Sequence, residues 1–421
     1  MNKRLLLVAW VVLSGISEAL AGEANYQPFL VGERALGMGG AVNATADGVD
    51  ALYYNPAGLA NTPQSRISLS ASLYGLQRYK TEDKVYPGED LEVRSVATVP
   101  AAVGGVSRVN DRWSAGFGVF VPSMGTAREI QAFEDLQHYY NWSYDEQILK
   151  LGPGVGWKVN DKVSVGAAAF GVYESASRFA NMYWGQVRQL SSHNYKYDVA
   201  SLVAGLGIQV RPAGPWRLGA TIESPSVRLW GDGSVMSSAI RGTRRGVATQ
   251  TTYIENLDAD HGLPTRVTAG LGWQKPKEVA IGMDVTHHFA RDYDWLKGTT
   301  SDGEDVTVER EREAVTDFQV GAEYYIRGKY PVRAGFFTSL SAAPETDPQR
   351  NAYPPHVNLY GVSASGGLED DRVVFNVGVN YVWGSGEDYG NRPATTGEPE
   401  AVVVDVEVEN LFVFVSTAYL F

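Results

Sequence analysis

Segments of alternating apolar and polar residues recur along the chain from residue 65 to its end. In one of them, apolar residues at 373, 375, 377, 379 and 381 alternate with Asn376, Gly378 and Asn380. A period of two is typical of a β-strand whose two faces meet different surroundings. The pattern predicts fourteen strands. They lie near 65–79, 93–106, 112–122, 146–158, 161–176, 196–211, 215–229, 263–273, 278–290, 313–327, 330–338, 357–367, 371–383 and 409–421.

The connections between these segments alternate strictly in length. The six short ones are 107–111, 160, 212–214, 274–277, 328–329 and 368–370. The seven long ones are 80–92, 123–145, 177–195, 230–262, 291–312, 339–356 and 384–408. Short turns on one side and long loops on the other are the rule for outer-membrane barrels. We therefore predict an all-β fold, a transmembrane antiparallel β-barrel of fourteen strands over residues 65–421, with apolar faces toward lipid and small or polar faces toward the lumen.

Both ends of the chain indicate export to the outer membrane. Residues 1–21 have the pattern of a secretory signal peptide: Lys3 and Arg4, a short apolar stretch, and the cleavage pattern Ala19-Leu20-Ala21. The last eleven residues alternate up to Phe421, a length that suits a tilted membrane-crossing strand. A terminal aromatic strand resembles the signal by which such barrels reach their assembly machinery. We expect location in the cell outer membrane and contact with that machinery through the last strand.

Residues 22–64 do not fit the strand pattern and contain the most specific motif of the chain. The glycine-rich run 33–41 is followed by the box Asn55-Pro56-Ala57. Proline fixes its own backbone, and glycines permit tight turns or close approach. This segment is either a periplasmic tail or a hatch that fills the lumen, which a barrel of this size otherwise leaves open. The candidate hatch and gating residues are Arg34, Gly37, Gly39, Gly40, Asn55, Pro56 and Ala57.

The segment from Arg34 to Ala60 resembles the N-terminal hatch of the FadL family of outer-membrane long-chain fatty acid and hydrocarbon transporters. The resemblance extends over nearly the whole mature chain, because the short motifs at 263–267, 331–335 and 354–358 resemble the starts of later strands in that family. It implies a fourteen-strand barrel with a hatch in its lumen and passive transport of long-chain fatty acids or other hydrophobic compounds. It also implies that the substrate leaves sideways into the bilayer through a kink in the third strand.

Two local features agree with that implied route. Pro122 and Gly125 close the third strand, and both residue types weaken ladder pairing, although an ordinary strand end has the same appearance. In the loop 123–145, Ile130, Phe133, Leu136 and Tyr140 fall near helical spacing, with Trp142 beside them. We expect an apolar helix there, which either forms an exposed substrate groove or packs down as a loop cap.

The sequence leaves two questions open: which residue meets the polar end of a substrate, and whether the barrel transports at all. A carboxylate would need a cationic partner, and Arg34, Arg178 and Arg188 are candidates by position alone. Fatty acid and neutral hydrocarbon therefore both stay in consideration. The alternative to transport is a barrel of the same build that acts as a secretion partner or shuttle, or as a surface scaffold.

Composition removes other classes of function. The chain has 36 Lys and Arg against 48 Asp and Glu, a net charge of −12, which argues against a nucleic-acid partner. It has no cysteine, so disulfides, thiolate metal sites and cysteine nucleophiles are excluded. His287 and His288 point to opposite faces of a strand and do not share one metal. We expect no enzyme activity, no cofactor and no metal. The expected partners are hydrophobic small molecules, outer-membrane lipid and lipopolysaccharide, and the expected state is a monomer.

Overall fold

The computed structural model describes residues 24–86, 88–97, 100–133, 137–185, 188–243, 246–300, 303–348, 354–393 and 399–421. The predicted signal peptide lies outside these residues. The described chain forms an antiparallel barrel that closes where β1 pairs with β19, from Arg66↔Leu420 to Thr81↔Val406. Five wall strands are each described in two segments, so nineteen strand segments make the fourteen strands that the sequence predicts, and this prediction is confirmed.

The unbroken wall strands are β1 (Arg66–Tyr86), β4 (Trp113–Phe133), β5 (His138–Lys158), β6 (Val163–Trp184), β7 (Gln189–Val210), β16 (Tyr330–Ser339), β17 (His356–Glu369), β18 (Val373–Pro393) and β19 (Pro399–Leu420). The wall strands in two segments are β2 (Glu89–Ala97) with β3 (Pro100–Arg108), β8 (Trp216–Glu223) with β9 (Val227–Thr243), β11 (Arg266–Lys275) with β10 (Gly246–Ala259), β12 (Val279–His288) with β13 (Arg291–Thr299), and β15 (Val315–Ile326) with β14 (Asp305–Arg312).

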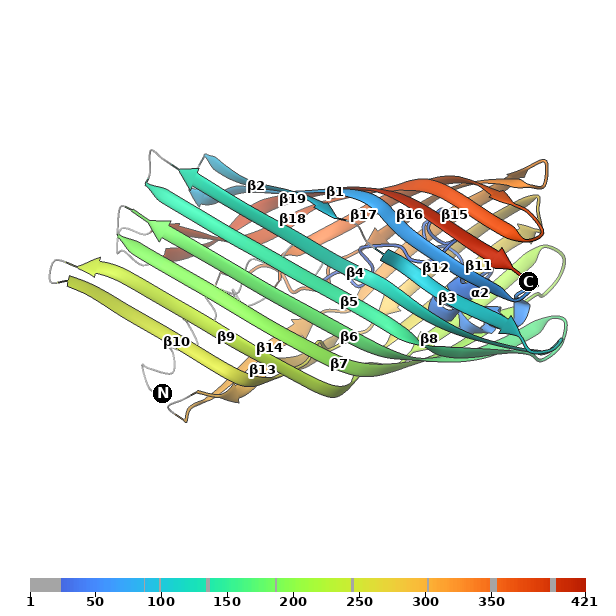
Figure 1. The fold of residues 1–421 in the computed structure, drawn as a ribbon, viewed down its shortest axis with the longest axis horizontal. Coiled ribbons are helices and arrows are strands. Elements are labelled where there is room, and N and C mark those ends of the chain that lie inside the picture. The colour runs from blue at the N-terminus through green and yellow to red at the C-terminus, as the bar shows by residue number, and fades with distance from the viewer. Residues whose placement is uncertain are drawn as a thin grey trace.

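The two faces of the wall differ as the alternation predicts. On β18, Phe375 is 45% exposed toward the outside, whereas Asn376 beside it is fully buried in the interior. The short turns and the C-terminus lie at one end of the barrel, and the long hairpins lie at the other (Figure 1). In outer-membrane barrels the end with the long hairpins is the extracellular one.

Six of the seven segments expected as long loops are in fact mostly paired strands. The hairpins β1–β2, β4–β5, β6–β7, β9–β10, β13–β14 and β18–β19 continue the wall beyond the segments that the sequence marks. Of the seven, the segment 339–356 has no strand of its own among its described residues, since β16 ends at Ser339 and β17 begins at His356. The alternation fades in these extensions because water, rather than lipid, faces their outer side.

The predicted helix in the loop 123–145 is wrong. Residues up to Phe133 belong to β4, and residues from His138 belong to β5, and these two residues pair with each other. Tyr140, Trp142 and Tyr144 follow a period of two on one face of β5 and are buried. The apparent helical spacing arises because the apolar residues are counted across a hairpin turn.

The N-terminal segment, residues 24–64, lies inside the barrel. It contains α2 (Gly48–Tyr54) and a 3₁₀ turn, η1 (Pro56–Asn61). Figure 1 shows α2 enclosed by the strands of the wall, near the end that carries the C-terminus. Among the described residues, no helix has the length and apolar character needed to cross a membrane.

Candidate functional site in the barrel interior

The Asn55-Pro56-Ala57 box rests directly on glycines of the wall. A methyl group on Gly166 of β6 would lie 2.2 Å from the carbonyl oxygen of Pro56, and one on Gly207 of β7 would lie 2.1 Å from Asn55 Oδ1. Both distances are far below van der Waals contact. The backbone of the N-terminal segment therefore reaches the wall only because these wall positions have no side chain.

Inward-facing glycines on neighbouring strands form the same kind of seat for residues 38–44. A methyl group would lie within 2.5 Å of this part of the N-terminal segment at the positions Gly219, Gly282, Gly321 and Gly335. The recurrence of glycine on one face of successive strands thus has a packing reason.

Asn55 is fully buried and organises the box by hydrogen bonds. Its Oδ1 accepts from the backbone nitrogen of Ala57 at 3.1 Å, which starts η1. Its Nδ2 donates to the carbonyl oxygens of Asn43 at 2.9 Å and of Ile208 at 3.1 Å. The box therefore joins two parts of the N-terminal segment and ties them to β7.

The glycine-rich run is held on the opposite wall. Gly39 has a φ of +62° and donates its backbone N–H to Ser363 Oγ at 3.0 Å. A methyl group on Gly37 would lie 2.1 Å from Ser365 Oγ. Gly40 also has a positive φ, +80°. These glycines supply a turn and a close approach that other residues do not allow.

Arg34 forms a buried ion pair with the wall. Its guanidinium lies 2.9 Å from Glu323 Oε1, and Arg333 Nε donates to Glu323 Oε2 at 2.6 Å. Arg34 also donates to the carbonyl oxygen and the hydroxyl of Thr45, both at 3.2 Å. This predicted hatch residue is thus used to anchor the segment.

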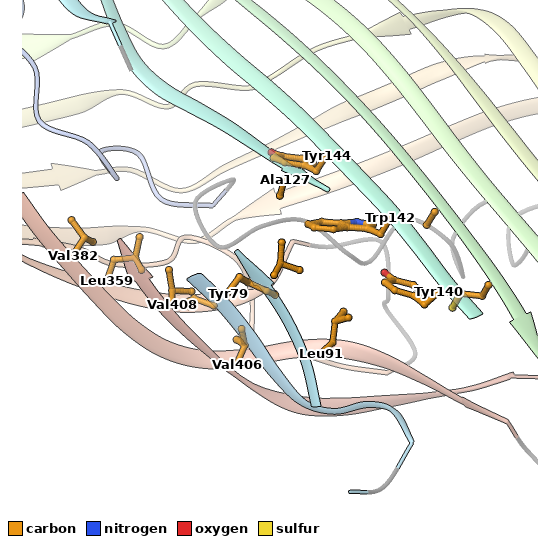
Figure 2. Packing of buried hydrophobic residues seen from close by; sticks show 14 of the residues in the cluster. Tyr79, Leu91, Ala127, Tyr140, Trp142, Tyr144, Leu359, Val382, Val406 and Val408 are labelled. Atoms are coloured by element: carbon orange, nitrogen blue, oxygen red, sulfur yellow. The ribbon is translucent and has the colours of Figure 1, made fainter. Parts of the chain in front are cut away.

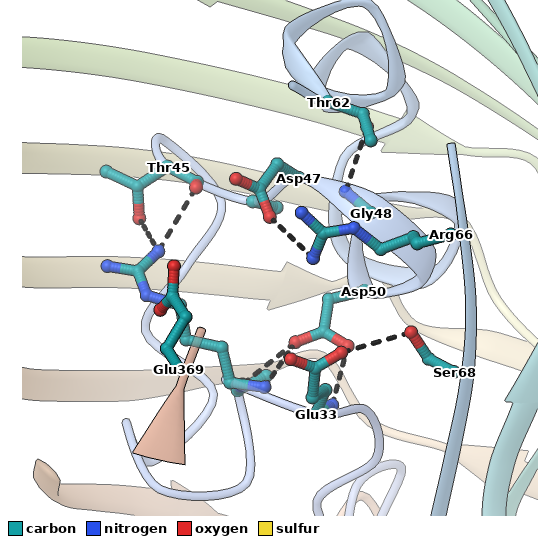
Figure 3. Close-up of polar contacts among 12 residues, drawn as sticks. Glu33, Thr45, Asp47, Gly48, Asp50, Thr62, Arg66, Ser68 and Glu369 are labelled. Atoms are coloured by element: carbon teal, nitrogen blue, oxygen red, sulfur yellow. Dashed lines mark hydrogen bonds and ion pairs between the residues drawn. The ribbon is translucent and has the colours of Figure 1, made fainter. Parts of the chain in front are cut away.

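Two buried carboxyls order the start of the N-terminal segment (Figure 3). Asp50 accepts from the backbone nitrogens of Glu33, Arg34 and Ala35 at 2.6–2.9 Å. Glu33 accepts from Ser68 Oγ at 3.0 Å. Burial raises the pKa of Glu33 to about 7, with the nearby Arg66 acting in the opposite direction. Burial likewise raises the pKa of Asp50.

A cavity lies between this segment and the extracellular hairpins; we call it the central pocket. The N-terminal segment contributes Asn25, Tyr26 and Tyr53 to its lining. The wall contributes Pro122, Ser123, Glu146, Ile148, Lys150, Val172, Glu174, Tyr197, Glu223, His261, Leu263, Pro264, Arg266, His288, Tyr293, Arg310 and Arg312. The central pocket therefore combines apolar and aromatic surface with charged groups.

One side of the central pocket is an ion-pair cluster. Lys150 Nζ lies 2.5 Å from Glu223 Oε2, and Arg266 lies 3.2 Å from the same oxygen. Lys150 also lies over the rings of Tyr53, at 5.2 Å, and Phe170, at 4.7 Å. Because Tyr53 belongs to α2, this cluster connects the wall to the N-terminal segment.

Another side of the central pocket carries a chain of buried hydrogen bonds around His261. The ring contacts Glu174 Oε2 through Nδ1 and Ser201 Oγ through Nε2, each at 2.9 Å. Tyr197 donates to the other oxygen of Glu174 at 2.6 Å. Ser201 is 1% exposed and does not line the pocket, so a bound compound does not reach its hydroxyl. These contacts fix the position of His261.

The wall is irregular where Pro122 lines the central pocket. The β4–β5 register passes from Phe120↔Lys150 to Ser123↔Ile148, so Val121 and Pro122 stand opposite one residue and form a β-bulge. On the other side of β4, the register with β3 runs as far as Phe120↔Ala102. Gly125 pairs regularly with Glu146, so the irregularity lies at 121–122 and not at Gly125.

The predicted groove residues are distributed over both faces of the wall. Phe133, Tyr140 and Trp142 are buried in an aromatic and aliphatic cluster of the extracellular half. Figure 2 shows Tyr140 and Trp142 with Tyr79, Leu91 and Val408 from other strands. Ile130 is 64% exposed on the outer face. Leu136 lies outside the described residues. The cluster lines the interior and replaces the expected helix.

None of the cationic candidates from the sequence lines the central pocket. Arg34 forms its ion pair with Glu323 near the short-turn end of the barrel. Arg178 is buried in the extracellular half, and Arg188 is exposed at the β6–β7 turn. The pocket instead has Lys150, Arg266, Arg310 and Arg312. The sequence feature that could have identified Lys150 and Arg266 is a charged residue on the inward face of a predicted membrane-crossing strand.

A closed barrel whose interior is filled at one end by an N-terminal segment defines the class of plugged outer-membrane channels. The chain belongs to the family described as Outer membrane protein transport protein (OMPP1/FadL/TodX), whose model matches residues 12–421. It is therefore an outer-membrane protein of a family of transport channels, not of enzymes. This membership supports passive passage of hydrophobic compounds.

Solved structures of the same fold agree with this assignment. The Pseudomonas putida toluene transporter TodX has a TM-score of 0.68 at 15% identity, with 94% of this chain and 100% of that chain covered. A Pseudomonas aeruginosa FadL homologue gives 0.66 at 14% identity, with 94% and 100% covered. The Ralstonia pickettii toluene transporter TbuX gives 0.60 at 15% identity, with 96% and 100% covered. At these identities the likeness concerns the fold.

Among curated proteins, the outer membrane protein NMB0088 of Neisseria meningitidis is 32% identical over 107 residues. The match covers 23% of this chain and 23% of that protein. It therefore carries no statement about the activity of the whole chain.

Proposed function

We propose that the protein admits long-chain fatty acids or other hydrophobic compounds to the central pocket and releases them sideways into the outer membrane. The observation that carries this proposal is the contact between pocket and bulge. Pro122 and Ser123 line the central pocket, and Pro122 is one of the two residues of the β4 bulge. A bulge locally interrupts the ladder, so the pocket adjoins the part of the wall that is weakest in backbone hydrogen bonds.

The proposed route begins at the extracellular half of the barrel. The cluster of Phe133, Tyr140, Trp142 and their neighbours offers apolar surface inside the barrel above the central pocket. A lipid-like compound gains free energy by leaving water for such a surface. The N-terminal segment, with its box on Gly166 and Gly207, blocks the straight path to the periplasm, which favours a sideways exit.

The charges of the central pocket favour a compound with an anionic end. Its lining has four Lys or Arg residues and three Glu residues. Two of the carboxylates are already engaged within the protein, Glu223 by Lys150 and Arg266 and Glu174 by His261 and Tyr197. A carboxylate placed near Arg266 therefore meets a surplus of positive charge, while its chain lies along Ile148, Val172 and Leu263.

The sideways exit is tested by removing the bulge. Deletion of Pro122 leaves Val121 opposite Leu149 and restores a regular β4–β5 ladder. We expect uptake of labelled oleate by cells to fall at least fivefold, while the protein still assembles in the outer membrane. The matched control is Pro122→Ala, which keeps both residues of the bulge, and which should keep uptake near the wild-type rate.

The same assay separates transport from the alternative function. Cells with and without the protein are compared for uptake of labelled oleate and of an aromatic hydrocarbon. If both rates are the same in the two cell lines, transport is refuted and a scaffold or secretion role takes its place. If uptake depends on the protein but not on the bulge, only the sideways route is wrong.

A further inference from the structure

The extracellular hairpin of β9 and β10 has a strand edge that no other described strand covers. β10 pairs with β9 from Gly246 to Leu257. On the other side of β10, among the described residues, β13 pairs with it only at Asp258 and Ala259. Figure 1 shows β9 and β10 reaching beyond the hairpin of β13 and β14 at the long-hairpin end of the barrel. Residues 247–254 therefore form an open edge of the sheet; we call them the β10 edge.

The ladder geometry identifies the backbone groups of the β10 edge that have no partner strand. Gly242 of β9 donates its N–H to the carbonyl oxygen of Arg188, so its backbone groups point toward β7 and away from β10. Gly242 stands opposite Val247, and antiparallel pairs alternate between bonded and non-bonded. Val247 and every second residue after it, up to residue 253, therefore direct their N–H and C=O groups to the open side of β10.

The β10 edge lacks the features that protect exposed edges from further pairing. Natural edge strands carry charged side chains, proline or a bulge, which prevent the addition of another strand. The sequence from 247 to 254 contains no Asp, Glu, Lys, Arg or Pro, and its register with β9 is regular. Val247 is 71% exposed and Tyr253 is 51% exposed. The edge is therefore both accessible and able to pair.

An apolar row on the outer face of the hairpins leads to this edge. Tyr139, Tyr183, Leu190 and Ile240 stand opposite one another in turn across β5, β6, β7 and β9. Each is between 36% and 40% exposed, and Ile240 stands opposite Thr249 of the β10 edge. An apolar side chain of an added strand would lie beside Thr249 and lengthen this row.

The end of the hairpin carries positive charge, although the chain has a net charge of −12. Arg188 is exposed and lies against β9, since a methyl group on Gly242 would be 3.2 Å from its Cβ. Arg241 stands opposite Ala248 of the β10 edge. Neither arginine forms an ion pair with a described residue. Charge therefore favours a segment with an acidic residue near this end of the edge.

A second copy of the chain in the same membrane does not fit the β10 edge. Two copies that meet at the same edge are related by a two-fold axis along the membrane normal. Barrel strands are tilted by about 35–45° from that axis, so the two β10 strands would cross at about twice this angle. Such a crossing allows neither a parallel nor an antiparallel ladder. The occupant must therefore be a different chain that is free to align with β10.

We infer that the β10 edge is a docking site at the cell surface for an extended segment of another protein, which adds to the sheet as one further strand. The segment has apolar or β-branched side chains at alternate positions and an acidic residue near the end of the hairpin. Backbone hydrogen bonds supply affinity, and the apolar row and the two arginines supply selectivity. The inference goes beyond the proposed function, since no residue of the β10 edge lines the central pocket.

The test selects peptides from a phage-displayed random library on the full-length mature protein in lipid nanodiscs, after depletion on empty nanodiscs. Enriched peptides are synthesised and titrated by fluorescence anisotropy. Thr251→Pro removes an N–H on the open side but no bond to β9, and it should weaken binding at least tenfold. The matched control, Thr251→Val, also loses the hydroxyl that contacts Ser238 Oγ at 3.0 Å but keeps the N–H, and it should bind within twofold of the parent.

A charge variant tests the same site without a change in the backbone. Arg188→Gln combined with Arg241→Gln should weaken binding of the enriched acidic peptides severalfold. Heat-dependent mobility on a gel verifies that each barrel is folded. The inference is overturned if no peptide is enriched, if Thr251→Pro and Thr251→Val bind alike, or if the enriched peptides lack both the alternation and the acidic residue.

The competing occupant, a second copy, is tested in cells that carry Val247→Cys, since the chain has no other cysteine. We expect this variant to remain monomeric. Disulfide-linked dimers of most of the protein would make a second copy the occupant and would overturn the inference. Oleate uptake should be unchanged in Thr251→Pro, and its absence from the parent protein would concern only the proposed function.

Discussion

The seat of the Asn55-Pro56-Ala57 box makes a sharp prediction at Gly166. Replacement of this glycine by alanine places a methyl group 2.2 Å from Pro56 O and 2.5 Å from Ala57 N. Ordinary contact begins at about 3.4 Å, so the N-terminal segment must move away from β6 by about 1 Å. Because the clashing atoms belong to the backbone, no side-chain rotation relieves the contact.

The size of the effect follows from the cost of overpacking. An extra methyl group in a well-packed interior costs about 1–3 kcal/mol. If this cost falls on the seated state of the N-terminal segment, the population of the unseated state rises about 5- to 150-fold. The wall itself should keep its stability, since Gly166 pairs with Gly156 of β5 and Gly207 of β7 through its backbone, and an inward methyl group removes neither pairing.

The chain has no cysteine, which makes the assay simple. Ala51 of α2 is fully buried, and the single cysteine of Ala51→Cys reports on unseating through its rate of reaction with a water-soluble maleimide. We expect Gly166→Ala to raise that rate by the factor given above. The control on the same strand is Gly171→Ala, whose methyl group would lie 3.8 Å from the nearest atom and should leave the rate unchanged.

Equal labelling rates for Gly166→Ala and the parent protein would refute the seating argument, provided that both barrels are folded. A barrel that fails to assemble in Gly166→Ala but not in Gly171→Ala would mean that the box is needed for folding rather than for closure. The two outcomes are distinguished by the heat-dependent mobility of the barrel on a gel.

Three further predictions concern buried groups. Glu323→Gln leaves the buried guanidinium of Arg333 and the partly buried one of Arg34 without their carboxylate, and it should lower the free energy of unfolding by about 3–5 kcal/mol. Glu92→Gln, in a pair whose side chains are about one-third exposed, should cost below about 1 kcal/mol; denaturant titration in micelles compares the two variants. Glu33 has its pKa raised to about 7, so its seated form prefers the neutral carboxyl; seating should be strongest below about pH 4.5 and should weaken as the pH rises through 7, and Glu33→Gln should remove this dependence of the maleimide rate. A rate ratio between the two proteins that is constant from pH 5 to 8 would contradict this. Trp142→Ala should cost about 3–5 kcal/mol because the ring is 4% exposed in the interior, and Tyr139→Ala on the outer face should cost far less; similar losses would contradict the strand placement.

Much of the fold could be predicted because its signals are local. The period of two in a segment such as 371–383 depends only on which face meets lipid, and the alternation of short and long connections follows from it. The same reasoning failed in the hairpins above the bilayer. There the outer side meets water, so the contrast between faces is lost, and Tyr140 is expected in a helix with Trp142 beside it, whereas both lie on the inward face of β5.

The candidate site could be predicted only in part, and the reason is distance along the chain. The motif at Asn55-Pro56-Ala57 and the bulge residue Pro122 are visible in the sequence because proline constrains its own backbone. The charges that meet in the central pocket are not, since Lys150, Glu223 and Arg266 come from three separate strands.

The sequence by itself determined the class of barrel, the number of its strands and the segment that is not part of the wall. The tertiary structure alone decided what the interior contains: which glycines seat the N-terminal segment, which charges are paired, and which residues line the central pocket. Strand number is a property of repeated local patterns, whereas a cavity is bounded by residues from distant strands, whose contacts exist only once the sheet has closed on itself.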